Sequence, residues 1–327
     1  MLRKPIIIVP GQIKSVFFEI FFKSIKAKKI NSPIILICNA DYFKTEAKRF
    51  KFYHNFKILN TINKKTLFSK NSINILNITI KKNKNKKTQL KYYNDYISNC
   101  FQKAFKIINN KISNKFLNGP INKKKFLSKK YLGITEYVAK KMKRRAVGML
   151  IYNKDLSVCP LTTHLPVKFI AKKITKKLIN KKLKMINDFY LANFKIKPKI
   201  GVAGLNPHCE SISKYNEDEK IISPAIKFSK KNGISVTGPY SADTIFLKQN
   251  RKKFNVILGM YHDQVLTPLK ALYEYDAINI TIGLPFLRVS PDHGPNEQMV
   301  NKNLSNPTSL IKALEFLDKN WLKQKKA

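Results

Sequence analysis

Short apolar runs alternate along the chain with longer stretches in which apolar residues recur at helical spacing. The apolar runs predict strands at 5–9, 33–38, 73–79, 115–120, 146–152, 157–163, 199–205, 254–261 and 277–283. The other stretches predict helices at 14–29, 91–113, 135–143, 167–194, 217–232 and 308–323. Strands that alternate with helices indicate an α/β fold with a largely parallel sheet.

The stretch 167–194 shows the helical pattern most clearly, with apolar residues on one face and lysines on the other. Its apolar positions are Ile170, Ile174, Leu178, Leu183 and Ile186. The segment 81–89, KKNKNKKTQ, has no such pattern and predicts a charged, solvated loop. No internal repeat and no obvious linker is found, so a chain that crosses between two lobes fits as well as two sequential domains.

The charge of the chain is extreme, with 64 Lys and Arg against 19 Asp and Glu and a net charge of +45. Such a field attracts polyanions. However, lysine, asparagine and isoleucine are abundant together throughout, as an AT-rich genome would produce, and no RNP, zinc-finger or basic-zipper pattern is present. A nucleic-acid partner is therefore not expected, although an anionic substrate would benefit from the field.

Two further features bear on the compartment. No apolar stretch approaches the ~20 residues of a membrane span, and the apolar run near the N-terminus is short enough to be a first strand. The four cysteines, Cys38, Cys100, Cys159 and Cys209, show no CxxC spacing, which fits reduced thiols. We expect a cytoplasmic protein with no membrane partner.

Three of the five histidines, His164, His208 and His262, each follow a predicted strand. In open α/β sheets the ligand crevice lies outside the carboxyl ends of the strands. Three imidazoles that meet there would form a site for a first-row transition metal. The spacings alone do not decide this, because each could instead be a loop histidine bonded to backbone.

A second group of polar residues brackets the strand predicted near 277–283. Lys270, Asn279 and Arg288 would together suit an anion or phosphate, and arginine can grip two oxygens at once. Neither a G-x-G-x-x-G run after a strand nor a Walker A pattern is present, so a standard Rossmann or P-loop nucleotide site is not supported.

Several motifs follow one another in a fixed order over residues 115–300: GPINK (119–123), TEY (135–137), TTHLP (162–166), GLNPH (204–208), GPYSADTIF (238–246), MYHDQ (260–264), NITIGLPFLR (279–288) and DHG (292–294). In this combination they resemble the 4-hydroxythreonine-4-phosphate dehydrogenase family of pyridoxal phosphate biosynthesis. The tail after DHG is similar to the wider isocitrate and isopropylmalate dehydrogenase superfamily, in which a comparable loop holds NAD.

The resemblance implies a two-lobed α/β/α sandwich with largely parallel sheets and an active site in the interdomain cleft at a dimer interface. It implies a first lobe, on the cofactor side, from residues 1–128 plus 284–327. Residues 129–283 would form the second lobe, which carries the metal and substrate side and the dimer contact. The partners implied are a second copy of the chain, with shared active sites, and a phosphorylated hydroxyamino acid substrate.

The resemblance also implies roles for individual residues. His164, His208 and His262 would hold one divalent metal ion (Zn, Mg or Co), with ligands from both subunits. Thr135, Lys270, Asn279 and Arg288 would contact the substrate. Asp243 and Asp263 would accept a proton or orient a ligand histidine. Asp292, His293 and Gly294 would lie at the cofactor, NAD or NADP. The activity implied is an oxidative decarboxylation of 4-phosphooxy-L-threonine to 3-amino-2-oxopropyl phosphate.

The chain departs from the family pattern in two places that keep an alternative open. Ile134 stands where the family has a histidine, and of the family's glycine-rich run near the N-terminus only Gly11 and Glu19 survive. The alternative is a dehydrogenase of a related phosphorylated hydroxy acid, such as threonate or erythronate 4-phosphate. A nucleic-acid-binding protein on this scaffold is a remoter alternative that only the charge favours, and intact metal-ligand candidates argue against a catalytically dead relative.

Overall fold

The computed structural model describes residues 3–122, 126–127, 131, 133–144, 146–210, 216–292 and 294–319. The chain divides into two compact units. Unit 1 takes its described residues from 1–143 and 284–320, and unit 2 takes its described residues from 144–283. Among the described residues no helix combines the length and apolar character that a membrane crossing requires.

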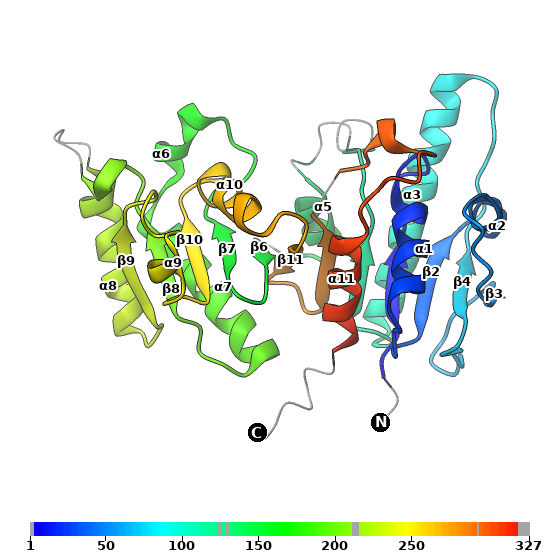
Figure 1. Cartoon of the computed structure of the whole chain (residues 1–327), viewed down its shortest axis with the longest axis horizontal. Helices are drawn as coiled ribbons and strands as arrows, with labels where there is room; N and C mark the ends of the chain where they lie inside the picture. The colour runs from blue at the N-terminus through cyan, green and yellow to red at the C-terminus, as the bar shows by residue number, and fades with distance from the viewer. Residues whose placement is uncertain are drawn as a thin grey trace. The chain divides into compact units, whose positions relative to one another are not determined.

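Unit 1 contains a parallel sheet with the strand order β3-β4-β2-β1-β5-β12. Every pairing within this order is parallel. Its strands are β1 (Ile6–Val9), β2 (Ile34–Cys38), β3 (Phe56–Leu59), β4 (Ile73–Asn77), β5 (Lys115–Asn118) and β12 (Leu287–Pro291). Because β12 comes from the second stretch of sequence and pairs with β5, the unit is completed only by the later part of the chain (Figure 1).

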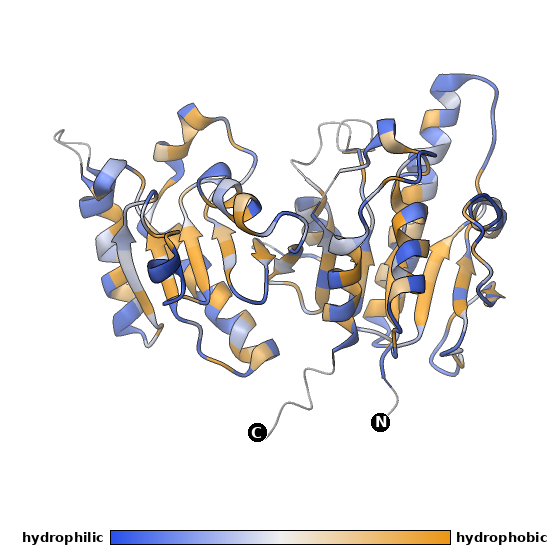
Figure 2. Ribbon diagram, viewed as in Figure 1, coloured by the Kyte–Doolittle hydropathy of each residue, from blue (hydrophilic) through white to orange (hydrophobic). Residues whose placement is uncertain are grey.

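Helices cover both faces of the unit 1 sheet. On one face Ile7, Val9, Ile35 and Ile37 pack in a common core with α3 (Lys86–Asn109). Side chains alternate along a strand, so Ile6 and Ile8 face the other side. There α1 (Phe17–Ala27), α2 (Ala40–Arg49) and α11 (Thr308–Asp318) pack against one another and against the strands. The apolar strands and helix faces meet inside the unit in Figure 2.

Unit 2 contains a mixed sheet with the strand order β11-β6-β7-β10-β8-β9. Strand β6 runs antiparallel to both of its neighbours, β11 and β7, and the other pairings are parallel. The strands are β6 (Gly148–Tyr152), β7 (Ser157–Pro160), β8 (Ile200–Ala203), β9 (Val236–Tyr240), β10 (Val256–Gly259) and β11 (Ile278–Ile282). The predicted α/β class with largely parallel strands is therefore confirmed.

The helices of unit 2 are α6 (Ile170–Lys173), α7 (Lys176–Phe194), α8 (Ser223–Lys231), α9 (Lys248–Arg251) and α10 (His262–Tyr273). Helix α10 packs on β7 and β10 and places Val265 and Leu269 in the core beside Ile257. Helix α7 buries Ile179 and Leu183 and packs against α8.

The domain boundary lies later in the sequence than we predicted. The prediction assigned residues 129–143 to the second lobe, whereas the described residues of this segment belong to unit 1. The reason is α5 (Ile134–Lys141), whose Ile134, Tyr137 and Val138 join the core that surrounds α3. Tyr137 packs edge-on against Phe101 of α3, with ring centroids 5.4 Å apart.

All nine predicted strands are present, but three other strands and several helices were missed or misplaced. Strands β3, β9 and β12 and helices α2, α9 and α10 were not predicted. The predicted loop 81–89 is helical from Lys86, because Asn85 caps α3 by accepting from the backbone N–H groups of Lys87 and Thr88. The helix predicted at 167–194 is broken at Ile174, which is extended, and α7 begins after Thr175 caps it.

Candidate active site

The three candidate metal ligands of unit 2 lie beyond the carboxyl ends of neighbouring strands. His164 follows β7, His208 lies in the short helix η2 (Pro207–Cys209) after β8, and His262 is the first residue of α10 after β10. Strand β10 pairs in parallel with both β7 and β8, so the three strands end at one edge of the sheet. That edge is where open α/β sheets bind their ligands.

His164 and His262 lie side by side at this edge. Their ring centroids are 5.9 Å apart and their planes differ by 34°. Nδ1 of His262 lies 2.6 Å from Oδ1 of Asp263, an exposed carboxylate. A carboxylate bonded to one imidazole nitrogen fixes the ring and leaves Nε2 available as a ligand atom. The pair therefore fits two ligand positions of a single transition-metal ion.

The backbone at His164 and His208 is in the left-handed region, with φ of 49° and 55°. Cys209, next to His208, also has a positive φ of 61°. Such conformations are uncommon for residues other than glycine, and they persist at functional sites where the surroundings fix them. Both loops therefore hold a histidine in a backbone conformation that costs energy, which is typical of residues placed for function.

The loop that carries His208 is fixed by hydrogen bonds to the carboxylate of Asp218, a residue that is 1 % exposed. Its carboxylate accepts from the backbone N–H of Leu205 at 2.7 Å and from the backbone and side-chain N–H groups of Asn206 at 3.0 and 2.9 Å. A Cβ on Gly204 would lie 2.6 Å from Oδ1 of Asp218, so only glycine allows this close approach. The GLNPH motif is thus a rigid turn around a buried carboxylate.

Two side chains connect the three histidine loops. Gln264 accepts from the backbone N–H of Met260 at 2.7 Å and donates through Nε2 to the carbonyl of Gly204, also at 2.7 Å. Thr162 donates its hydroxyl to the carbonyl of Met260 at 2.8 Å. The loop before His262 is therefore tied on one side to the His164 loop and on the other to the His208 loop.

The structure brings two of the three histidines together. Across the described ranges, no three His, Cys, Asp or Glu side chains lie close enough to hold a metal ion jointly. His208 is exposed on η2, and residues 211–215 that follow it lie outside the described residues. The pair of His164 and His262 fits a metal, while the third position would have to come from a change in the His208 loop or from another chain.

Arg288 forms the centre of a second cluster, in unit 1. It lies on β12 with 2 % exposure, donates through Nε to Oδ1 of Asn118 at 2.9 Å and donates through Nη1 to the hydroxyl of Thr135 at 3.0 Å. Burial lowers the pKa of Arg288 to about 10, although the nearby Glu136 carboxylate opposes this shift. The guanidinium still carries its charge at neutral pH, and an anion would compensate part of the cost of burying it.

The other predicted substrate contacts lie in unit 2. Lys270 is on α10 and Asn279 is on β11. The carbonyl oxygen Oδ1 of Asn279 is buried and has no hydrogen-bond partner among the described residues. An unpaired buried acceptor is costly, so this atom is a candidate contact for a donor on a ligand.

The remaining predicted site residues are Asp243 of unit 2 and the segment 292–294. Asp243 is exposed in the turn after β9, and its charge adds to burial and to Asp218 in raising the pKa of the Cys209 thiol. The backbone N–H of Asp292 donates to the Ser309 hydroxyl at 3.0 Å. Gly294 is exposed, and His293 lies outside the described residues.

Sequence reasoning missed the residues that hold these clusters in place. Thr162 and Gln264 were within reach, because they belong to the TTHLP and MYHDQ motifs that carry two of the histidines. Asn118, the partner of Arg288, likewise lies within the strand predicted at 115–120, directly before the GPINK motif. Asp218 gave no usable signal, since it is one of several acidic residues in the NEDE run and only burial distinguishes it.

The comparisons with known proteins agree on one family. The family model described as pyridoxal phosphate biosynthetic protein PdxA matches residues 29–317. A 4-hydroxythreonine-4-phosphate dehydrogenase of Wigglesworthia glossinidia brevipalpis is 34 % identical over 318 residues, which cover 95 % of each chain. The chain belongs to the PdxA family.

Other PdxA relatives match more strongly over a shorter part. The enzyme with the same name from Sulfurihydrogenibium sp. is 43 % identical over 188 residues, 57 % of this chain. The match spans 58 % of that relative's length, less than two thirds. A crystal structure of a 4-hydroxythreonine-4-phosphate dehydrogenase from Burkholderia phymatum superposes with a TM-score of 0.78 at 25 % identity, and the match covers 97 % of this chain and 98 % of that one.

Proposed function

We propose that the chain is a 4-hydroxythreonine-4-phosphate dehydrogenase of pyridoxal phosphate biosynthesis. It would oxidise 4-phosphooxy-L-threonine with NAD or NADP to a β-keto acid, which loses CO₂ to give 3-amino-2-oxopropyl phosphate. Membership of the PdxA family and the names of its relatives support this activity. The observation that carries the proposal is the His164–His262 pair at the ligand-binding edge of the sheet, with the His208 loop tied to it by Gln264.

The substrate phosphate would bind to the cationic side chains. Arg288 is buried and held by Asn118 and Thr135, so its planar fork is fixed before the substrate arrives. Lys270 would add a second positive charge, and Asn279 would use its buried carbonyl oxygen to accept a hydrogen bond from the substrate. A substrate positioned by its non-reacting phosphate keeps the reacting carbon in register with the cofactor.

His164, His208 and His262 would hold the divalent metal, with the ligand set completed across a homodimer. When bound, such an ion acidifies the substrate hydroxyl and stabilises negative charge on oxygen. Asp263 orients His262 through the contact between its Oδ1 and Nδ1 of the imidazole. Asp243, which is exposed after β9, is the candidate acceptor of the hydroxyl proton while the hydride leaves for the nicotinamide.

One observation favours a second candidate substrate. Ile134, where the family has histidine, is 9 % exposed and packs into the unit 1 core. It offers no hydrogen bond beside Thr135, so contacts to the amino acid end of the substrate are weakened. A phosphorylated threonate or erythronate would lose less from this change, and faster oxidation of that sugar acid phosphate than of 4-phosphooxy-L-threonine would establish the second candidate.

The proposed activity is tested with His208→Ala, measured by metal content and by NAD(P)H formation with 4-phosphooxy-L-threonine. We expect the variant to lose bound metal and activity together, because a ligand is removed from a three-histidine set. His54→Ala is the matched control, since it removes an exposed histidine of unit 1 that stacks on Phe52. The control should retain both properties. A His208→Ala protein that keeps its metal and full turnover would overturn the site.

A further inference from the structure

Glu136 of unit 1 carries a carboxylate for which the described part of the chain supplies no partner. It lies in the first turn of α5, directly after Thr135. Its Oε2 atom is buried and accepts no hydrogen bond from a described residue. No ion pair joins it to the described residues either. An unpaired buried acceptor costs free energy, and the cost is larger for a charged group. A donor from a ligand would remove this cost.

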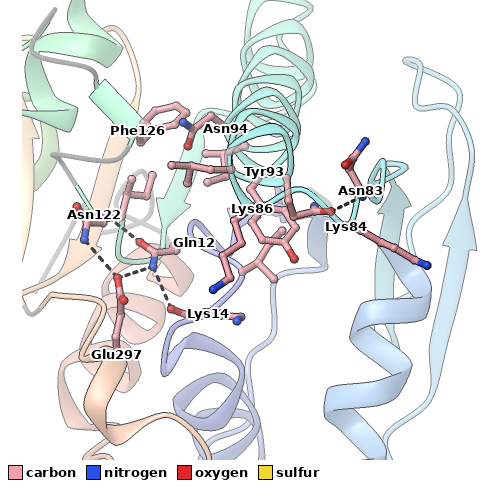
Figure 3. A pocket seen from close by; sticks show the side chains of 15 residues that line it. Gln12, Lys14, Asn83, Lys84, Lys86, Tyr93, Asn94, Asn122, Phe126 and Glu297 are labelled. Atoms are coloured by element: carbon pink, nitrogen blue, oxygen red, sulfur yellow. Dashed lines mark hydrogen bonds between the residues drawn. The ribbon is translucent and has the colours of Figure 1, made fainter.

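The other glutamates of unit 1 all have a partner. Glu297 accepts from Nε2 of Gln12 at 2.8 Å and from Nδ2 of Asn122 at 3.2 Å (Figure 3). The rest form ion pairs: Glu19 with Lys23, Glu46 with Arg49, and Glu315 with Lys28. Because the chain has 64 Lys and Arg against 19 Asp and Glu, an acidic side chain has many cations to pair with. Glu136 is therefore an exception that calls for a reason.

The lysines of α5 itself are directed to aromatic rings. Lys140 lies four positions after Glu136, the spacing at which a glutamate and a lysine pair best on a helix. Its Nζ lies instead over the ring of Tyr131, 5.6 Å from the centroid. Lys141 likewise lies over Tyr137, at 5.8 Å. An acidic residue is favourable near a helix N-terminus, which accounts for a glutamate here but not for its unpaired oxygen.

A cation and an anion of the chain lie near one another in this cluster. The hydroxyl of Thr135 accepts from Nη1 of the buried Arg288 at 3.0 Å. Burial lowers the pKa of Arg288 and the charge of the nearby Glu136 opposes that shift. Such a pair suits a ligand that carries an anionic and a cationic group a few atoms apart. A phosphorylated amino acid has both groups, whereas a phosphorylated sugar acid has only anionic ones.

The carboxylate of Glu136 can be reached by such a ligand. The residue is only partly buried, as is Thr135 beside it. The last torsion of a glutamate side chain is broad and roughly two-fold, so either carboxylate oxygen can turn toward a donor.

We infer that Glu136 binds the ammonium group of the substrate and thereby selects an amino acid over a sugar acid. This inference rests on the proposed dehydrogenase function and deepens it by naming the residue that sets substrate choice. In 4-phosphooxy-L-threonine the ammonium group stands beside the hydroxyl that is oxidised, and erythronate 4-phosphate has a second hydroxyl in its place. The ammonium donates to Glu136, while the wholly anionic sugar acid is repelled by it. Glu136 thus replaces the contact that Ile134 cannot make.

The test compares two ligands on the wild type and on Glu136→Gln. The full chain is titrated calorimetrically, in the presence of Mg²⁺, with 4-phosphooxy-L-threonine and, separately, with erythronate 4-phosphate. We expect the wild type to bind the amino acid about 10- to 100-fold more tightly, as one charge-assisted hydrogen bond allows. Glu136→Gln should remove most of this preference, mainly by weakening the amino acid. Similar affinities in the wild type, or an unchanged preference in the variant, would overturn the inference.

A merely structural role for Glu136 predicts a different result. If Glu136 only kept Arg288 in place, its loss would weaken both ligands by the same factor, because both carry the phosphate, and that result would also contradict the inference. Glu315→Gln is the matched control, since it removes the same charge from a partly exposed ion pair of unit 1. The control should keep the wild-type preference.

Failure of the proposed function can be distinguished from failure of this inference. Steady-state assays with NAD and with NADP are run on both ligands and both proteins. If the proposed function fails, the preference in binding and its loss in Glu136→Gln persist while neither ligand is oxidised. If Glu136 has no part in selection, 4-phosphooxy-L-threonine is oxidised and the ratio of kcat/KM for the two ligands is the same in the variant as in the wild type.

Discussion

Gln264 shows how much the candidate metal site depends on a single neutral side chain. Its carbonyl oxygen accepts from Met260 beside His262, and its amide nitrogen donates to Gly204 before His208. A Cβ on Gly259 would approach Oε1 of Gln264 to 3.0 Å, so the amide lies tightly against the end of β10. Residues that fix metal ligands from behind contribute to affinity almost as directly as the ligands.

The isosteric variant Gln264→Glu tests this role. A glutamate can still accept from Met260, but its carboxylate would face the carbonyl of Gly204 and repel it. We expect metal affinity to fall by about 10- to 100-fold while the fold is retained. Equilibrium dialysis against Zn²⁺ or Co²⁺ and far-UV circular dichroism measure the two properties.

Gln249→Glu serves as the control for Gln264→Glu, because it makes the same chemical change on the exposed surface of α9. It should bind metal as the wild type does. Unchanged metal affinity in Gln264→Glu would mean that the loops keep their positions without this link.

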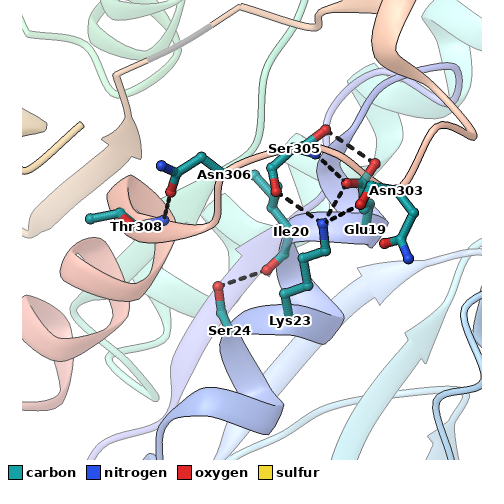
Figure 4. Close-up of polar contacts among 8 residues, drawn as sticks. All are labelled: Glu19, Ile20, Lys23, Ser24, Asn303, Ser305, Asn306 and Thr308. Carbon is teal, nitrogen blue, oxygen red and sulfur yellow. Dashed lines mark hydrogen bonds and ion pairs between the residues drawn. The ribbon is translucent and has the colours of Figure 1, made fainter. Parts of the chain in front are cut away.

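At the scale of elements, a buried carboxylate joins α1, the first helix of unit 1, to the segment that precedes its last helix, α11. Glu19 of α1 is 2 % exposed and accepts from the backbone N–H and hydroxyl of Ser305 at 2.6 and 3.1 Å (Figure 4). Lys23, one turn later, pairs with Glu19 at 2.8 Å and donates to the carbonyls of Asn303 and Ser305. Glu19 and Lys23 therefore fix the chain between β12 and α11 against α1.

Glu19→Gln should therefore destabilise unit 1. The neutral amide weakens the contacts with Lys23 and the Ser305 hydroxyl, and charge-assisted hydrogen bonds in buried positions contribute about 1.5–3 kcal/mol. We expect the midpoint of urea unfolding, measured by circular dichroism at 222 nm, to fall. Glu315→Gln is the control, because its ion pair with Lys28 is partly exposed and such pairs contribute about 0–1 kcal/mol. Equal midpoints for the two variants would contradict the role of Glu19.

The elements that the sequence predicted and those it missed differ in their local pattern. Strand β1 and strand β2 are wholly apolar and buried, and both were predicted within a residue or two. Strand β9 contains Gly238 and Pro239, and β3 is exposed at three of four positions, so neither shows a buried-strand pattern. Helix α10 was not predicted because it begins three residues after β10 ends and contains Pro268, a residue that usually interrupts a helix.

The candidate site was predictable to the extent that its chemistry is local. The apolar runs before three histidines were enough to place these residues at one edge of the unit 2 sheet, because parallel strands end together. The contact between Arg288 and Thr135 joins residues 153 positions apart and was not predicted, because the family resemblance implied only that each of them contacts the substrate. The unit 1 cavity that Lys14, Lys84 and Lys86 line gave no signal at all, since these lysines cannot be distinguished in sequence from the many others.

At the scale of the whole molecule, the net charge of +45 should influence how anionic ligands arrive. Long-range attraction raises association rates and is screened by salt, whereas contacts inside a site are screened much less. We expect kcat/KM for the proposed phosphorylated substrate to fall several-fold between low and physiological ionic strength, with kcat nearly constant. Steady-state assays in potassium chloride measure this. A kcat/KM that is independent of salt would show that the charge plays no part in substrate capture.

The division of unit 1 between two stretches of sequence has a consequence for synthesis on the ribosome. Strand β12 pairs with β5, and Ser305 bonds to Glu19 across 286 positions. Unit 2 lies between these stretches, so its strands are all made before unit 1 can close its sheet. Domains generally fold as units during translation. The emerging chain would thus hold β1 to β5 with an unpaired edge at β5 until residues 284–305 are made. During this period the exposed edge of β5 is the part of the chain that a chaperone would protect from aggregation.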